Sequence, residues 1–176
     1  RIIENYADGS RLVKDVQTVD DTHFYVGSRF CHIQQYANQC FKRGCYVEPE
    51  HPQPGDKLDR LLIYQIPHYT CEYRFTDYDY AQNKLKATDY RCAYVANMPW
   101  DYTPDKCFRD FNYDDRPCAN STPSLSVSDL IVMERRDKAE ALYVDAVGFK
   151  DVSRLLPELH DMEVERQEHN LDELER

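Results

Sequence analysis

The chain has 176 residues, the usual length of one domain, and it carries 32 acidic against 22 basic residues for a net charge of −10. This charge disfavours nucleic acid and anionic membrane surfaces as partners, because both require clustered Lys and Arg. No uninterrupted apolar run approaches the roughly 20 residues needed to cross a bilayer. The chain begins at Arg1-Ile2-Ile3 without the pattern of a signal peptide, so we expect a mature or trimmed chain with no membrane span.

Short apolar stretches at Leu12–Val16 and His23–Phe30 open the chain, and the aromatic and β-branched residues of the second predict a strand. Gly27 within it indicates a bulge or a close backbone approach. The segment Cys31–Cys45 has few β-branched residues and predicts either a short helix or a loop closed by disulfides. Glu48–Gly55 contains three prolines and is the clearest predicted loop.

The middle of the chain predicts a β-hairpin. Arg60–Ile66 is a continuous apolar run typical of a buried strand, and Pro67 ends it. From Tyr69 to Thr76 apolar and polar residues alternate, which predicts a strand with one buried face. Ala81–Lys84 can form a turn, after which Leu85–Ala96 is expected to return as the partner of that strand.

The part of the chain after Met98 predicts a loop, a second hairpin and a helix. Pro99–Pro123 is rich in Asp, Asn, Pro and Tyr, and we expect its cysteines to pin it. Asp129–Met133 and Ala141–Val147 predict the hairpin. A C-terminal helix is expected to start near Leu156, with a proline in its first turn.

Charge is concentrated at the C-terminus. Glu158 to Arg176 contains eight acidic residues and two arginines, so −6 of the −10 lies there. A charge run is usually a solvated face, and binding of a basic partner is the alternative. We therefore expect a β-rich domain over residues 1–157, with residues 158–176 as an acidic helix or tail of the same domain.

The cysteines predict the compartment. Seven of them within 90 residues indicate a disulfide-bonded, secreted, extracellular protein, because reducing compartments keep thiols unpaired. The odd number leaves one cysteine either free or joined to another chain. Asn120-Ser121-Thr122 is an N-glycosylation acceptor in a polar stretch that should be exposed. The cysteines are Cys31, Cys40, Cys45, Cys71, Cys92, Cys107 and Cys118.

The motifs of common catalytic and cofactor sites are absent from the sequence. It has no Gly-x-Ser-x-Gly, no phosphate-cradling glycine loop, no Cys-x-x-Cys and no His-Glu-x-x-His. The acidic segments Asp77–Asp79 and Asp110–Asp115 place oxygen ligands in short loops, but the glycine and glutamate of an EF-hand do not follow Asp77. We therefore expect no enzyme activity, no cofactor and no metal site.

The predicted fold is mainly β, a β-rich α+β domain built as an antiparallel barrel or curved sheet, with disulfide-stapled loops and a C-terminal helix. Its size, its hairpins, the late helix and the tyrosine-rich strands make it resemble the lipocalin-type secreted carriers in outline only. The Gly-x-Trp of that family has no counterpart, since the sole tryptophan, Trp100, follows Met98-Pro99 in a predicted loop.

The predicted function is a secreted carrier or scavenger of a hydrophobic small molecule such as a lipid, bound inside the barrel or cradle. Tyrosine suits a cavity wall because it combines an apolar body with a polar tip. The alternative is an extracellular protein-interaction or structural module without a cavity, and a dimer linked through the odd cysteine is one form that it could take. The expected wall residues are Tyr69, Tyr73, Phe75, Tyr90 and Tyr94.

Overall fold

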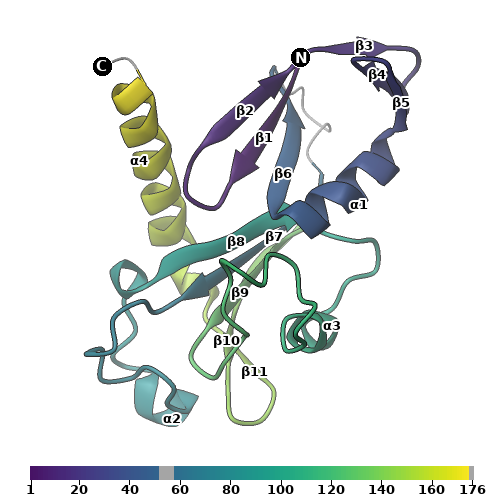
Figure 1. The fold of residues 1–176 in the computed structure, drawn as a ribbon. Coiled ribbons are helices and arrows are strands. Elements are labelled where there is room, and N and C mark those ends of the chain that lie inside the picture. The colour runs from purple at the N-terminus through teal and green to yellow at the C-terminus, as the bar shows by residue number, and fades with distance from the viewer. Residues whose placement is uncertain (52–57, 175–176) are drawn as a thin grey trace.

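In a computed structural model, which describes residues 1–51 and 58–174, the chain forms three antiparallel sheets and a long C-terminal helix (Figure 1). The predicted loop Glu48–Gly55 lies partly outside the described residues, from Pro52 onward. No helix within the described ranges is long and apolar enough to cross a membrane.

Two small sheets and a helix make up the N-terminal part. The first sheet has the order β2-β1-β6 and the second the order β3-β4-β5. Helix α1 follows β5 and ends at Gly44, whose φ of 71° and close approach to Cys118 Sγ, 2.7 Å from an added Cβ, require glycine. The elements are β1 (Ile2–Tyr6), β2 (Arg11–Lys14), β3 (Val16–Thr18), β4 (His23–Val26), β5 (Arg29–His32), α1 (Ile33–Arg43) and β6 (Cys45–Pro49).

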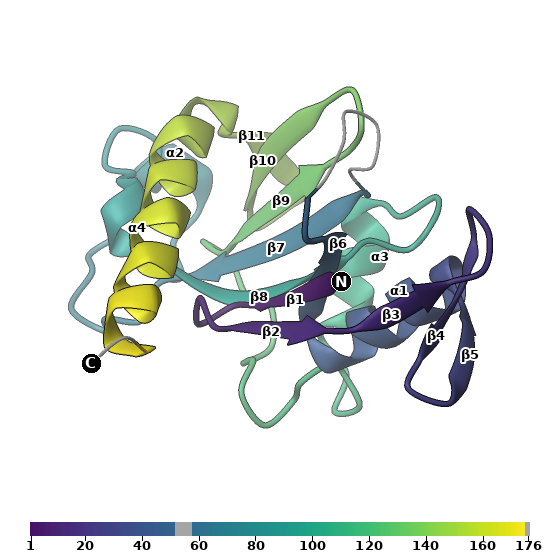
Figure 2. The ribbon, with the colours of Figure 1, turned by 90° about the horizontal axis from the view of Figure 1, so that it is seen from above.

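The central sheet has the order β11-β10-β9-β7-β8, and every neighbouring pair is antiparallel. Two short helices lie in its connections. Helix α4 follows β11 and lies at the opposite end of the molecule from the β3-β4-β5 sheet (Figure 2). The elements are β7 (Arg60–Gln65), α2 (Tyr78–Ala81), β8 (Arg91–Asn97), α3 (Pro104–Asp110), β9 (Leu130–Glu134), β10 (Ala139–Val144), β11 (Phe149–Asp151) and α4 (Leu156–Leu174).

The central sheet is buried on both faces. Side chains alternate along β7, so Leu62 and Tyr64 pack on one face while Leu61 and Ile63 pack on the other. The first turns of α4 cover the Leu62 face, whereas α3 and the last turn of α1 cover the opposite face. This double cover explains why β7 and β9 are continuous apolar runs without alternation in the sequence.

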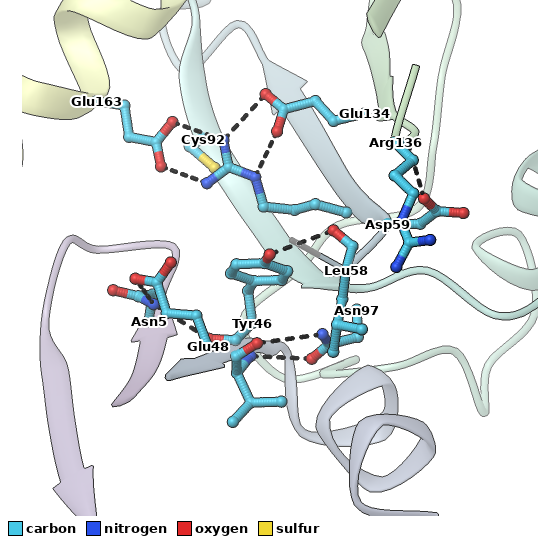
Figure 3. A network of polar contacts seen from close by, with 12 residues as sticks. Asn5, Tyr46, Glu48, Leu58, Asp59, Cys92, Asn97, Glu134, Arg136 and Glu163 are labelled. Carbon is cyan, nitrogen blue, oxygen red and sulfur yellow. Dashed lines mark hydrogen bonds and ion pairs between the residues drawn. The ribbon is translucent and has the colours of Figure 1, made fainter. Parts of the chain in front are cut away.

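An ion-pair network fastens α4 to the sheet. Arg60 of β7 donates two hydrogen bonds to the Glu134 carboxylate, at 2.8 and 3.0 Å, and two to Glu163 of α4, at 2.6 and 3.1 Å (Figure 3). All three side chains are largely buried. Because each carboxylate engages the guanidinium through two atoms, the network fixes the direction in which α4 leaves the sheet.

The central predictions are partly confirmed. The strand at 60–65, the hairpin of β9 and β10 and the helix from Leu156 are present, and Cys31–Cys45 contains a helix. The predicted barrel is wrong, because among the described residues the strands form three separate sheets and none closes. The lipocalin-like outline is therefore absent.

The predicted strand at residues 69–76 is also wrong. This segment is a series of turns, in which Cys71, Arg74 and Thr76 each donate a backbone hydrogen bond three residues back. Phe75 has a φ of 65°, which lies outside the β region that a regular strand requires. Strand β8, which was predicted to pair with residues 69–76, pairs with β7 instead.

All seven cysteines lie within the described residues, and each is a free thiol. The predicted disulfide stapling is not shown. Five of the seven are buried, where cysteine packs as a small apolar side chain. Cys71 and Cys118 are partly exposed.

Candidate functional site

A pocket of about 360 Å³ opens where β7 ends and β8 begins. The end of β7 contributes Gln65, and the loop before β9 contributes Ser126 and Asp129. The turns at 69–76 contribute Arg74 and Phe75, and β8 contributes Arg91. The pocket thus combines one carboxyl group, two guanidinium groups and an aromatic ring.

Asp129 is the buried polar group of this pocket, with 4% of its surface exposed. Its Oδ2 accepts hydrogen bonds from Gln65 Nε2 at 3.0 Å and from the Ser126 backbone N–H at 2.8 Å. Its Oδ1 accepts none from the described residues. The carboxyl group therefore has one oxygen fixed and one left to bind a proton or a ligand.

Burial raises the pKa of Asp129 to about 7, and the hydrogen bonds from Ser126 and Gln65 and the charge of Arg74 offset this only in part. The group consequently changes between a neutral acid and a carboxylate near neutral pH. As an acid it can donate a hydrogen bond from Oδ1, and as a carboxylate it can accept one there.

Two strained backbone positions support the pocket. Phe75 and Ser128 have φ values of 65° and 82°, in the left-handed region that costs side-chain-bearing residues on the order of 1–3 kcal/mol. The Phe75 N–H donates to Ser128 Oγ at 2.9 Å, and the Tyr90 hydroxyl donates to the Ser128 carbonyl at 2.7 Å. These bonds hold the Phe75 ring in a largely exposed position, with the Arg74 guanidinium 4.5 Å from its centre.

The five predicted wall residues do not gather around one cavity. Tyr73 and Tyr90 are core residues with ring centres 6.4 Å apart, and Tyr94 is buried on the opposite face of the sheet. Tyr69 is 85% exposed. Phe75 lines the Asp129 pocket, and Tyr94 lines a separate cavity of about 520 Å³ that shares Arg91 with it.

The main polar residues of the pocket were missed because they are far apart in the sequence and form no motif. Gln65 and Asp129 are 64 positions apart, and only the pairing of β7 with β9 brings them together. The sequence did contain one signal for Asp129. This residue directly precedes the apolar run Leu130–Met133, which indicates a carboxyl group at the buried end of a strand.

Three buried side chains could also hold a metal ion. The ligand atoms of Glu4, Cys40 and Cys45 lie within 4.8 Å of one another. However, the Glu4 carboxylate already accepts hydrogen bonds from the Tyr36 and Tyr6 hydroxyls, from Lys14 and from Arg43. Hydrogen bonds alone therefore satisfy this group, and the cluster has a structural explanation.

The fold and the pocket define a small α+β protein with a polar pocket at one end of a five-stranded antiparallel sheet. Residues 60–154 match the YodL-like domain, which is more than half of the chain, and the protein therefore belongs to the YodL-like family. The match spans β7 to β11 and every pocket residue named above. No curated protein and no solved structure is significantly similar to the chain.

Proposed function

We propose that this protein is a carrier or scavenger that binds a small amphipathic molecule in the Asp129 pocket. The carboxyl group of Asp129 carries the proposal, because it is almost fully buried and leaves Oδ1 without a hydrogen-bond partner among the described residues. Oδ1 is not among the buried polar atoms that lack a partner, so it is open to the pocket. A ligand can therefore bond to Oδ1 without displacing a hydrogen bond made within the described residues.

The pocket residues define the ligand's chemistry. Arg74 and Arg91 suit an acidic group, since guanidinium pairs with carboxylates through two parallel hydrogen bonds. Asp129 suits a hydroxyl or N–H group, while Ile66, Pro67 and Phe75 supply apolar contact. The volume of about 360 Å³ is within the range of small-molecule sites. The ligand is therefore expected to carry an acidic group and a hydroxyl or N–H group as well as apolar surface, and a hydroxylated fatty acid has these features.

Native mass spectrometry of protein purified without added ligand tests this proposal, followed by organic extraction of whatever is released. Wild type should carry a small molecule in stoichiometric amount, and Asp129→Asn, which keeps the side-chain shape, should lose most of it. Asp114→Asn is the matched control, because it makes the same side-chain change at an exposed position in a turn. The proposal is overturned if the wild-type protein has no affinity for any hydroxylated fatty acid and co-purifies with nothing.

A protein-interaction module is the second candidate function, and exposed aromatic residues at 99–123 favour it. Trp100 is 89% exposed and Tyr113 is 58% exposed, and large aromatic side chains are enriched in interfaces. Replacing Trp100 with Ala should abolish capture of a partner while leaving the Asp129 ligand bound. An unchanged set of partners would exclude this surface as the interface.

Secretion and glycosylation remain predictions of the sequence. Asn120 is exposed within a turn, where an acceptor asparagine is accessible to modification. The mass of the naturally produced protein before and after glycosidase treatment tests the modification. A dimer linked through one cysteine would halve in mass on reduction.

A further inference from the structure

A second cavity, of about 520 Å³, lies between the N-terminal part of the chain, the central sheet and α4. The β1–β2 turn contributes Tyr6 to Asp8, the end of α1 contributes Arg43 and Gly44, and α4 contributes Arg166. Strand β8 supplies the floor from Arg91 to Tyr94. Most of these elements lie outside residues 60–154, so this cavity depends on segments that the family match does not include.

The lining is basic, although the protein as a whole is acidic. Three arginines, Arg43, Arg91 and Arg166, face one acidic residue, Asp8. The Asp8 carboxylate accepts two hydrogen bonds from Ser10, at 2.6 and 2.8 Å, and these bonds together with the charge of Arg166 lower its pKa. Asp8 is therefore ionised and already bonded, and its single charge leaves the lining with a net positive charge.

The three arginines differ in their hydrogen-bond partners. Arg43 donates a 2.8 Å hydrogen bond to Glu4. Arg91 and Arg166 make no hydrogen bond and no ion pair with the described residues. The Nε–H of Arg166 is, in addition, buried without a partner. A buried N–H of this kind costs about 1–3 kcal/mol unless something bonds to it.

Neighbouring contacts hold Arg166 in place. Asn170, one turn further along α4, donates a 2.9 Å hydrogen bond to the Asp8 carbonyl. Gly9 packs so closely against α4 that an added Cβ would lie 2.5 Å from Asn170 Nδ2 and 2.8 Å from Arg166 Cγ. The aliphatic part of the Arg166 side chain is therefore packed against the β1–β2 turn before any ligand arrives, which reduces the entropy cost of binding.

We propose that this cavity binds a small phosphate-bearing molecule, with the phosphate held by Arg91 and Arg166 and its charge balanced further by Arg43. Arginine forks match phosphate oxygens through paired hydrogen bonds, and Arg91 and Arg166 are the two arginines of the lining that have no such partner among the described residues. The cavity volume accommodates a phosphate monoester with a small organic part. This site is separate from the Asp129 pocket and shares only Arg91 with it.

Calorimetric titration with inorganic phosphate and with a nucleoside monophosphate tests the proposal. Arg166→Gln should weaken binding at least tenfold, whereas Arg29→Gln, an equal charge change at an exposed position of β5, should leave it unchanged. Asp129→Asn should also bind normally, which separates this site from the proposed function. Tighter binding of the monophosphate than of inorganic phosphate identifies an organic phosphate as the ligand, and equal affinities identify the free ion.

A thiol in the lining gives a readout that does not depend on the variants folding. Cys118 lines the cavity and is partly exposed, while Cys71 is partly exposed elsewhere. Bound phosphate compound should slow alkylation of Cys118 several-fold and leave Cys71 unchanged, as measured by peptide mass spectrometry. The proposal is overturned if neither phosphate compound slows the alkylation of Cys118. It is also overturned if folded Arg166→Gln binds the phosphate compounds as tightly as wild type does.

Discussion

Asn97 of β8 is hydrogen-bonded through its side-chain amide to both backbone groups of Val47 on β6. The Val47 N–H donates to Asn97 Oδ1 at 2.9 Å, and Asn97 Nδ2 donates to the Val47 carbonyl at 3.4 Å (Figure 3). Both residues are buried. The amide therefore joins the β2-β1-β6 sheet to the edge strand of the central sheet.

Removing the Asn97 side-chain amide should lower the free energy of unfolding, because the amide connects the two sheets. Asn97→Ala leaves a buried N–H and a buried carbonyl of Val47 without partners, so we expect a loss of about 2–4 kcal/mol in the free energy of unfolding. Urea unfolding measures it. Asn83→Ala, at an exposed position, is the control and should change stability by less than about 0.5 kcal/mol. Equal effects of the two variants would contradict the linking role.

Loss of the Glu163 carboxylate should loosen α4. Glu163→Ala leaves the buried Arg60 with Glu134 as its acidic partner. The free energy of unfolding should therefore fall by about 2–3 kcal/mol, at or below the lower end of the range for breaking a buried ion pair. Hydrogen exchange should show faster exchange confined mainly to α4. Glu165→Ala, on the exposed side of the same helix, should do neither.

Asp129 should make the protein less stable as pH rises. Its folded pKa, about 7, is above its unfolded value near 3.9, so the folded state holds the extra proton between these values. This contribution is complete below about pH 4 and is lost by pH 8, with an upper limit of about 4 kcal/mol. Unfolding of wild type and Asp129→Asn between pH 4 and 8 measures it. An identical pH dependence in both proteins would contradict the raised pKa.

Glu4 should act in the opposite direction and in a more acidic range. Burial alone would raise its pKa, but hydrogen bonds from Tyr36, Tyr6 and Lys14 and the charge of Arg43 lower it to about 2. Its contribution to stability is therefore present above about pH 4 and lost as pH falls towards 2. Glu4→Gln should be less stable at pH 7 and should lose this acid dependence. The exposed change Glu72→Gln should preserve both.

The thiol state of the protein can be measured directly. Reaction with an aromatic disulfide reagent in denaturant should detect all seven thiols, and under native conditions Cys71 and Cys118 should react first because the other five are buried. Detection of a single thiol in denaturant would instead support three disulfides.

The local sequence determined the strands and helices that pair with the next element along the chain or that consist of an unbroken run of apolar residues. The run Leu61–Tyr64 is apolar and buried throughout, which is typical of a strand covered on both faces. Strands β9 and β10 are joined by a short turn, and α4 begins where Pro157 favours a first helical turn. The C-terminal acidic residues predicted a solvated helix face for the same local reason.

Only the tertiary structure decided the pairing of β8, the state of the cysteines and the two candidate sites. The alternation at 69–76 predicted a strand, but its residues bond locally in turns and β8 bonds to β7. Asp129 meets Gln65, and Arg166 meets the β1–β2 turn, across separations of 64 and more than 150 residues. Burial and hydrogen bonding between such distant groups depend on how strands and helices pack, and no local pattern of residues encodes that packing.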